Sequence, residues 1–494
     1  MTENQVYPLE LQDSPEPQVG KVEKRLHRFA SFIPGVSSFV HRPWKIIESE
    51  NFEEEELYHG PNRLLPLRIG QLLHEKRYKV VGKLGWDTSG TTWLCQDKQA
   101  SEKSTKFVTV KLFRHQEKEP EHHHEIDLYR KIRGSILESM EEHRIRPYLD
   151  NFWLREGPWT FHALVLKPCA LTLDDLRKSG NLRRRDVPWI LQHILQALRF
   201  LHQSYYLHLN ITPENIVLEP QSNRVYFKFA RQESLEPSDR KYITDVLPAY
   251  PIYRHRSVKW TNWLGKDRHC DAWKQEREIG NTQPQWYRAP EVILGMNFSA
   301  PADVWNLACV MANVVQDASD LPLVYKPGMN WSSGEHLLNI ACTIGLPPKE
   351  MGERAARIAN SGFTKDEYGR LKLTASGNCL FSIKPAPTYL EQHTSSQDPQ
   401  FLAFLRGCLV WEPKMRLTTK QLLDLRWIQT ALSRQQRERW HAKRRTGVSA
   451  KRSIDVAQLI FRAEGCRIKV DGGGGTRTEN APAPLYKQHV HYIT

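Results

Sequence analysis

The sequence predicts an α+β protein with two lobes, a small β-rich lobe followed by a larger helical one. From Tyr78 to about residue 168, short segments alternate apolar and polar residues between turn-rich stretches, which is typical of strands. Beyond Pro168, longer segments carry apolar residues at helical spacing. The 494 residues are too many for one small domain and suit one large two-lobed domain with tails.

These changes of pattern set the predicted boundaries. We expect an N-terminal tail over 1–64, the β-rich lobe over 65–168, the helical lobe over 169–430 and a basic, flexible tail over 431–494. The flexible character of the last segment follows from its stretch DGGGGTRTENAPAP, which has the composition of a linker.

The β-rich lobe is expected to contain strands and one main helix. RYKVVGKLG, TTWLCQD, KFVTVKLF and FHALVLKP each predict a strand. HHHEIDLYRKI predicts the helix, with Ile126, Tyr129 or Arg130, and Ile132 facing inward. Three adjacent histidines at a helix start point in different directions, so we expect no metal site there.

Four segments predict the main helices of the second lobe. They read VPWILQHILQALRFLHQ, PADVWNLACVMANVVQ, DPQFLAFLRGCLVWEP and LTTKQLLDLRWIQTAL. The second of them is nearly all apolar, which predicts a buried central helix.

Composition and charge indicate which partners and which cellular compartment to expect. The net charge of +14 favours acidic partners such as phosphoproteins, nucleic acid or an anionic membrane face, although basic surfaces also occur on proteins that bind none of these. The basic segment 436–445 is interpreted as a solvated helix end, with a nuclear signal or an RNA-contacting patch as alternatives. The eight cysteines form no CxxC pair, and no apolar run is long enough to span a bilayer. We therefore expect a protein of the cytoplasm, the nucleus or both.

Three elements of the first lobe have the chemistry of a phosphate site. In LGWDTSGTTWL, Gly85 and Gly90 bracket a short turn, where backbone N–H groups can approach phosphate oxygens. Lys111 follows on the strand VTVKLF, and Glu125 lies on the predicted helix. A lysine held by a helix glutamate can reach phosphates, and the order and spacing of the three elements are together uncommon.

With these elements and the later motifs HLNITPENIVL, TQPQWYRAPEVILG, PADVWNLAC and LRGCLVWEPKMRLTTKQLLDLRWI, the sequence resembles the eukaryotic protein kinases. Within that superfamily it is similar to the SR-protein kinases. The resemblance covers about residues 65–428 and implies a bilobal protein kinase fold, an ATP-dependent serine/threonine kinase ancestry, and a protein substrate or protein partner.

The parts of this resemblance that maintain the fold are kept. The resemblance implies that Glu291 of APE pairs with Arg416 of KMR. It also implies that Asp303 braces the catalytic loop, in which His208 is the structural histidine.

The parts that carry chemistry are altered. Asn210 stands where the family has the aspartate that accepts the proton of the substrate hydroxyl, and Thr212 stands where it has a lysine. Leu209 replaces the family's arginine, whereas Asn215 is kept. An amide cannot take up a proton at physiological pH, so the loop is predicted to lack a general base.

A count of the family's usual spacing from Asn215 puts Lys228 at the position of the aspartate that holds Mg²⁺, on an expected strand that includes RVYFKFA. An ammonium group repels a cation, so we predict no metal site. The cofactor is predicted to be ATP held without Mg²⁺, with Lys228 near the phosphates, or none. The nucleotide-contacting positions implied by the resemblance are Leu84, Gly85, Gly90, Thr92, Thr109, Lys111, Asn215, Val217 and Lys228.

Three of the positions around a nucleotide depart from the family. Thr92 and Thr109 replace apolar residues that sandwich adenine, and Asp87 replaces a glycine near the phosphates. Hydroxyl groups against a flat apolar ring add a desolvation cost.

The favoured function is therefore a pseudokinase that regulates or scaffolds partners. The first alternative is a weak serine/threonine kinase with a rearranged site, for which Glu219 and Glu233 are the spare carboxylates. The second is an interaction module whose cleft is filled by its own side chains. The predicted activation segment, 228–291, is rich in Trp and Tyr and is expected to pack on its own lobe or on a partner.

Overall fold

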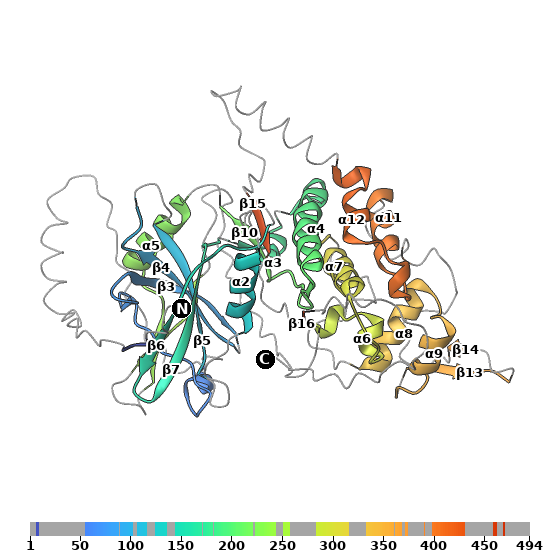
Figure 1. Cartoon of the computed structure of the whole chain (residues 1–494), viewed down its shortest axis with the longest axis horizontal. Helices are drawn as coiled ribbons and strands as arrows, with labels where there is room; N and C mark the ends of the chain where they lie inside the picture. The colour runs from blue at the N-terminus through green and yellow to red at the C-terminus, as the bar shows by residue number, and fades with distance from the viewer. Residues whose placement is uncertain are drawn as a thin grey trace, which may run out of the picture. The chain divides into compact units, whose positions relative to one another are not determined.

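A computed structural model of the chain describes residues 6–8, 55–429, 458–461 and 468–469, with gaps inside the long range at 88, 102–105, 116–123, 136–143, 170, 181, 221–222, 244–249, 257–282, 316–331, 360, 368–370, 374–389 and 391–397. The chain divides into two units (Figure 1). Unit 1 comprises Met1–Ile126, Pro147–Ala170 and Pro220–Asp267, and unit 2 comprises Asp127–Arg146, Leu171–Glu219 and Arg268–Thr494.

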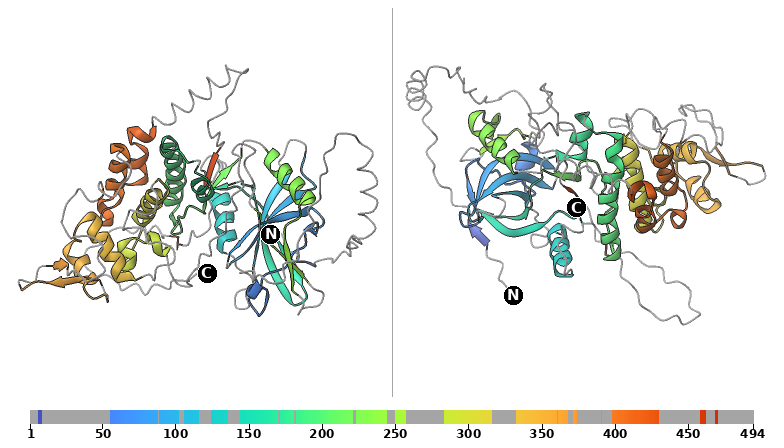
Figure 2. Two further views of the ribbon diagram at one scale, coloured as in Figure 1. Left: turned by 180° about the vertical axis from the view of Figure 1, so that it is seen from behind. Right: turned by 90° about the horizontal axis from the view of Figure 1, so that it is seen from above.

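Unit 1 is built on a seven-stranded sheet of order β1-β6-β7-β5-β4-β3-β2. Figure 2 shows the ribbon from behind and from above. Neighbouring strands of the sheet pair antiparallel, except that β1 runs parallel to β6. The strands are β1 (Val6–Pro8), β2 (Leu72–Leu73), β3 (Tyr78–Asp87), β4 (Gly90–Asp97), β5 (Phe107–Phe113), β6 (Tyr148–Glu156) and β7 (Trp159–Leu166). The helix α2 (His124–Ser135) follows β5, and the division between the units falls within it.

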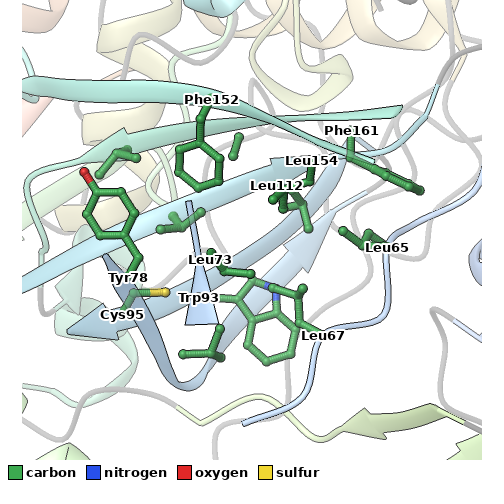
Figure 3. Close-up of a cluster of buried hydrophobic side chains, with 14 of the residues drawn as sticks. Leu65, Leu67, Leu73, Tyr78, Trp93, Cys95, Leu112, Phe152, Leu154 and Phe161 are labelled. Carbon is green, nitrogen blue, oxygen red and sulfur yellow. The ribbon is translucent and has the colours of Figure 1, made fainter. Parts of the chain in front are cut away.

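One face of this sheet carries the hydrophobic core of unit 1. Trp93 and Cys95 of β4 lie on it together with Val108, Val110 and Leu112 of β5, which follows from the alternation of side chains along a strand. Figure 3 shows Trp93 and Leu112 among the aromatic and aliphatic side chains of the other strands. The opposite face carries Thr109 and Lys111, which are the predicted site residues of β5.

The segment that follows the catalytic loop belongs to unit 1, which differs from the predicted boundary. The expected strand around RVYFKFA is the helix α5 (Arg224–Leu235). Its buried residues are Tyr226, Phe229 and Glu233, at spacings of three and four, so the amphipathic helical pattern was present in the sequence. An apparent alternation over seven residues concealed it.

A hairpin completes this segment. Its strands are β11 (Arg240–Ile243) and β12 (Tyr250–Tyr253). Ile243 and Ile252 pack in a small core with Tyr58 and Leu64. The predicted N-terminal tail is therefore partly folded, because the 3₁₀ helix η1 (Glu55–Tyr58) contributes to this core.

Unit 2 is mainly helical, as predicted. Its helices are α3 (Leu173–Lys178), α4 (Val187–Gln203), α6 (Pro290–Ile293), α7 (Ala300–Val315), α8 (Ser333–Ile344), α9 (Lys349–Ala355), α11 (Pro399–Cys408) and α12 (Thr419–Leu423). Three 3₁₀ helices, η2 (Arg184–Asp186), η3 (Gln285–Tyr287) and η4 (Pro413–Met415), and the hairpin of β13 (Phe363–Lys365) and β14 (Leu371–Leu373) complete it. The predicted central helix is α7, whose side chains are buried almost throughout.

The predicted C-terminal tail contributes two strands to unit 2. β15 (Gln458–Phe461) pairs antiparallel with β10 (Ile216–Glu219), whose other edge pairs with β8 (Leu171–Thr172). β16 (Ile468–Lys469) pairs antiparallel with β9 (Tyr206–Leu207). The prediction of a wholly flexible tail is wrong at these residues, because their backbones complete the ladders on both sides of the catalytic loop.

We expect proline in β15 to loosen β10. Proline removes a ladder donor, and alternate residues of a strand donate toward a given neighbour, so either Leu459→Pro or Ile460→Pro should break a bond to β10. Hydrogen exchange of the β10 amides should be faster in that variant than in the native chain, and Ser449→Pro, which lies before β15, is the control. Unchanged exchange in both strand variants would show that the pairing contributes nothing.

Several predictions concern residues outside those the structure describes. They are the basic segment 436–445, the region 257–282 of the predicted activation segment, and most of the N-terminal tail. Among the described residues, no helix is long and apolar enough to cross a membrane, and no cluster of His, Cys, Asp and Glu is arranged to hold a metal. The described cysteines are all free thiols.

Candidate functional site

The register of the unit 1 sheet brings the predicted nucleotide positions together on one face. Residues that pair across strands share a face. Gly85, Thr92, Lys111 and Leu164 form one row across β3, β4, β5 and β7. Gly82, Leu94, Thr109 and Leu166 form the adjacent row. We call this the site face. Leu84 lies at an irregularity of β3 between the rows and is half-buried.

Lys111 is held in the predicted ion pair. Its Nζ atom donates to Glu125 Oε2 at 3.0 Å, and it lies 5.0 Å from the centre of the Phe113 ring. The lysine side chain is only 4% exposed, so water screens this pair little.

Asp87 lies at the other side of the same ammonium group. Its Oδ2 atom is 3.9 Å from Lys111 Nζ. Its Oδ1 atom accepts the backbone N–H groups of Ser89 at 2.6 Å and Gly90 at 3.1 Å, as well as the Ser89 hydroxyl. The sequence pointed to a negative charge here, but not to its use of the N–H groups of the turn. An internal carboxylate thus receives the donors that a phosphate would need.

The helix α5 covers the part of the site face where the resemblance implies the nucleotide base. A Cβ atom on Gly82 would lie 2.7 Å from a ring carbon of Phe229, so the helix approaches β3 where a side chain is absent. The Tyr226 hydroxyl donates to the Pro168 carbonyl at 2.8 Å, and its ring lies 5.9 Å from that of Phe107. Thr109 is fully buried, and its hydroxyl has no hydrogen-bond partner. Thr92 stays half-buried.

These features do not fit a bound nucleoside triphosphate on unit 1. A triphosphate would have to displace the Asp87 carboxylate from the turn and from Lys111. Adenine would have to displace aromatic side chains and would leave the Thr109 hydroxyl against its flat face.

In unit 2, Asp303 braces the catalytic loop as predicted. Its carboxylate accepts the N–H groups of His208 and Leu209, each at 2.8 Å, and lies 2.9 Å from Nε2 of His202. Leu209 adopts a φ of 57°, a left-handed conformation that is strained for a branched residue and requires such fixing. Burial alone would raise the pKa of Asp303, but the hydrogen bond and charge of His202 lower it overall.

The remaining loop is held by internal amides. The side chain of Asn306 bonds both the N–H and the C=O of Ile211, at 3.1 and 2.9 Å. The Asn210 N–H donates to Nδ1 of His208 at 3.2 Å. These bonds hold the backbone of the loop at Asn210 and Ile211.

The predicted catalytic positions lie on this loop. Asn210 is half-buried, and its carbonyl accepts the side-chain amide of Asn215 at 2.9 Å. Thr212 is buried, and its hydroxyl accepts the Asn215 N–H at 3.3 Å. Val217 is buried on β10. A neutral amide and a hydroxyl thus stand at the positions where the resemblance implies a base and a cation.

The predicted pair between Glu291 and Arg416 is found. Two guanidinium nitrogens of Arg416 each donate to a Glu291 carboxylate oxygen at 2.7 Å, and both side chains are fully buried. Arg416 also donates to the carbonyls of Pro301, Val410 and Trp411, so its donor set is well used.

Residues 274–428 match the family model of the protein kinase domain. They contain Glu291, Asp303 and Arg416, which make the contacts expected of that family. The predicted resemblance to the eukaryotic protein kinase superfamily is thereby confirmed over this part of the chain. A serine/threonine protein kinase of Aspergillus fumigatus is 24% identical to it, over 81% of this chain and 98% of that protein.

Other relatives of the chain belong to particular groups of protein kinases. The serine/threonine-protein kinase SRPK of Physarum polycephalum is 24% identical, over 73% of this chain and 87% of that one. Human dual specificity tyrosine-phosphorylation-regulated kinase 4 is 25% identical, over 72% of this chain and 59% of that protein. A solved kinase domain covers 74% of this chain and 98% of its own at 21% identity, with a TM-score of 0.47. The family match and the SRPK relative confirm the predicted likeness to the protein kinases and, among them, to the SR-protein kinases. The strands of unit 1 and the helices of unit 2 agree with the predicted α+β fold class.

The structure corrects two of the predicted site residues. Lys228 is an exposed residue of α5 in unit 1, not a residue of the expected strand. Glu233, a predicted spare carboxylate, is buried and accepts the N–H of Ser238 at 2.7 Å and pairs with Arg256 Nε at 3.0 Å. A fixed spacing from Asn215 was the cause of the error, because α5, β11 and β12 follow the catalytic-loop strand.

Proposed function

We propose that this kinase-family protein is a pseudokinase that regulates or scaffolds a protein partner, with little or no phosphoryl transfer. The observation that carries the proposal is Asn210. It stands at the position of the general base on a loop whose supporting contacts, from Asp303 and Asn306, are otherwise complete.

The size of the expected loss supports this function. General-base help contributes roughly 10²–10⁴-fold to a rate, which is about 3–5 kcal/mol in activation free energy. A carboxamide has no basic lone pair at physiological pH and cannot supply that help. Thr212 adds to the loss, because a hydroxyl does not offer the positive charge that a lysine offers to a moving phosphoryl group.

A weak serine/threonine kinase is the second candidate. Two retained features favour it, the ion pair between Lys111 and Glu125 and the side chain of Asn215. In kinases these residues bind the phosphates and the metal, so their presence is expected of a chain that still uses ATP. The position of Lys228 on α5 also removes one argument against the weak kinase, because Lys228 no longer stands in the place of a metal ligand.

We expect the full-length chain to transfer no labelled phosphate from ATP to Ser-Arg or basic peptides above the level of its Lys111→Ala variant. The measurement is radiolabel incorporation with Mg²⁺ and, separately, with Mn²⁺. The Asn210→Asp variant tests the missing base alone. Incorporation by the native chain that disappears in Lys111→Ala would establish the weak kinase instead, and strong activity of Asn210→Asp would show that the base was the one missing part.

A further inference from the structure

Both ends of the site face are occupied by parts of the chain itself. The row that contains Lys111 lies beside the turn between β3 and β4, where Asp87 takes the donors of Ser89 and Gly90. The row that contains Thr109 is covered at Gly82 by Phe229 of α5. Leu94, Thr109 and Leu166 of this row are at most 1% exposed.

The contacts of α5 are specific rather than a general apolar cover. Tyr226 is 1% exposed, and its hydroxyl is hydrogen-bonded to the backbone carbonyl that follows β7. Phe227, although 48% exposed, lies edge-on against Phe107 at 4.9 Å. Tyr226 thus places a flat ring with one hydrogen-bond donor on this face, two features that it shares with a nucleobase.

The C-terminal end of α5 is fastened to the sheet by charged groups. Glu233 binds Ser238 and Arg256, and the backbone N–H of Arg256 donates to the carbonyl of Lys83 on β3 at 3.0 Å. The carbon Cγ of Glu233 would lie 3.6 Å from a Cβ atom on Gly82. The helix is therefore held at β3 by both its apolar face and this ion pair.

We propose that α5 and Asp87 form an intramolecular plug of the nucleotide face of unit 1. Tyr226 and Phe229 take the place of the base, and the Asp87 carboxylate takes the place of a phosphate at the turn and Lys111. The native chain is thereby kept free of nucleotide, and removal of the plug exposes a face that binds ATP. Nothing in this inference depends on Asn210, so it stands apart from the proposed function.

The test measures ATP binding to full-length variants by calorimetry, in EDTA and in Mg²⁺. The plug variants are Asp87→Gly and the combination of Tyr226→Ala with Phe229→Ala; Ser234→Ala is the control, because Ser234 lies on the exposed side of the same helix. We expect no saturable binding by the native chain or the control. The triple variant, which combines Asp87→Gly with Tyr226→Ala and Phe229→Ala, should bind ATP at least roughly tenfold more tightly than the native chain. Each 1.4 kcal/mol of competition that the substitutions remove corresponds to a tenfold change in the dissociation constant.

Two further variants keep the test decisive. Lys111→Ala in the triple-variant background should abolish the binding, since the phosphates lose their cation. Glu233→Gln weakens the ion pair with Arg256 and leaves the aromatic residues in place, so it opens the plug without a cavity if the triple variant fails to fold. Native binding as tight as that of the variants would overturn the plug, and so would folded Glu233→Gln and Asp87→Gly variants that bind no ATP.

The outcome separates this inference from the proposed function. Nucleotide binding by the native chain without phosphate transfer overturns the plug and leaves the pseudokinase. Phosphate transfer by the native chain overturns both.

Discussion

Replacement of Arg416 by Ala is expected to lower the free energy of unfolding by about 3–5 kcal/mol, because removal of one partner strands a buried charge. Glu291 would keep a carboxylate at 0% exposure with no cation beside it. The carbonyls of Val410 and Trp411 would lose a donor as well. Thermal and urea unfolding of the full-length chain measure the change.

Two matched variants serve as controls for this measurement. Lys414→Ala removes an exposed cation two residues away, and such surface changes usually stay within about 0.5 kcal/mol. Arg416→Lys keeps the charge but not the planar fork that reaches both carboxylate oxygens. We expect stability to decrease from native to Lys to Ala. A melting curve of Arg416→Ala that matches the native one would contradict a buried pair.

Replacement of Asp303 by Ala should have the second large effect. The N–H groups of His208 and Leu209 would be left buried without an acceptor, and each such group costs about 1–3 kcal/mol. The strained φ of Leu209 would lose its support at the same time. Asp303→Asn, which keeps one carbonyl oxygen, is the matched control and should cost less. Equal stability of Asp303→Ala and the native chain would exclude the bracing role.

The same carboxylate predicts how stability depends on pH. The pKa of Asp303 in the folded chain lies below its ordinary value, since the lowering by His202 and the N–H groups exceeds the raising by burial. A lowered pKa contributes stability that is complete above the unfolded value of about 4 and is lost as pH falls through the folded one. Acid unfolding of Asp303→Asn should therefore have a shallower slope below about pH 4 than that of the native chain.

Local periodicity and motif contacts were enough to predict much of this molecule. The strands β3, β4, β5 and β7 follow from alternation, and α4 and α7 follow from apolar stripes. The pair of Glu291 with Arg416 and the bracing by Asp303 follow from the family's motifs, because each motif residue has a fixed partner in the fold.

Other features depend on contacts that no local pattern contains. RVYFKFA fits strand-like alternation as well as helical spacing, and the packing of Phe229 against Gly82 of β3 favours the helix over the strand. The carboxylate of Asp87 was visible as a charge, but its bonds to the turn depend on backbone geometry. Likewise, β15 is a short segment in a Gly-rich and basic context, and its strand conformation depends on a partner far away in the chain.

The pairing of β10 with β15 determines the order in which the protein can fold during its synthesis. β10 ends at Glu219, and its partner begins at Gln458, so about 240 residues must follow before the ladder can close. At roughly 5–20 residues per second, the ribosome needs about 10–50 s to deliver them. Throughout that interval the nascent chain presents the open edge of an apolar strand, Ile216, Val217 and Leu218, which is the kind of edge that chaperones bind and that promotes aggregation. Slow decoding before residue 458 would lengthen this exposure, and release of the chain before that point would make it permanent.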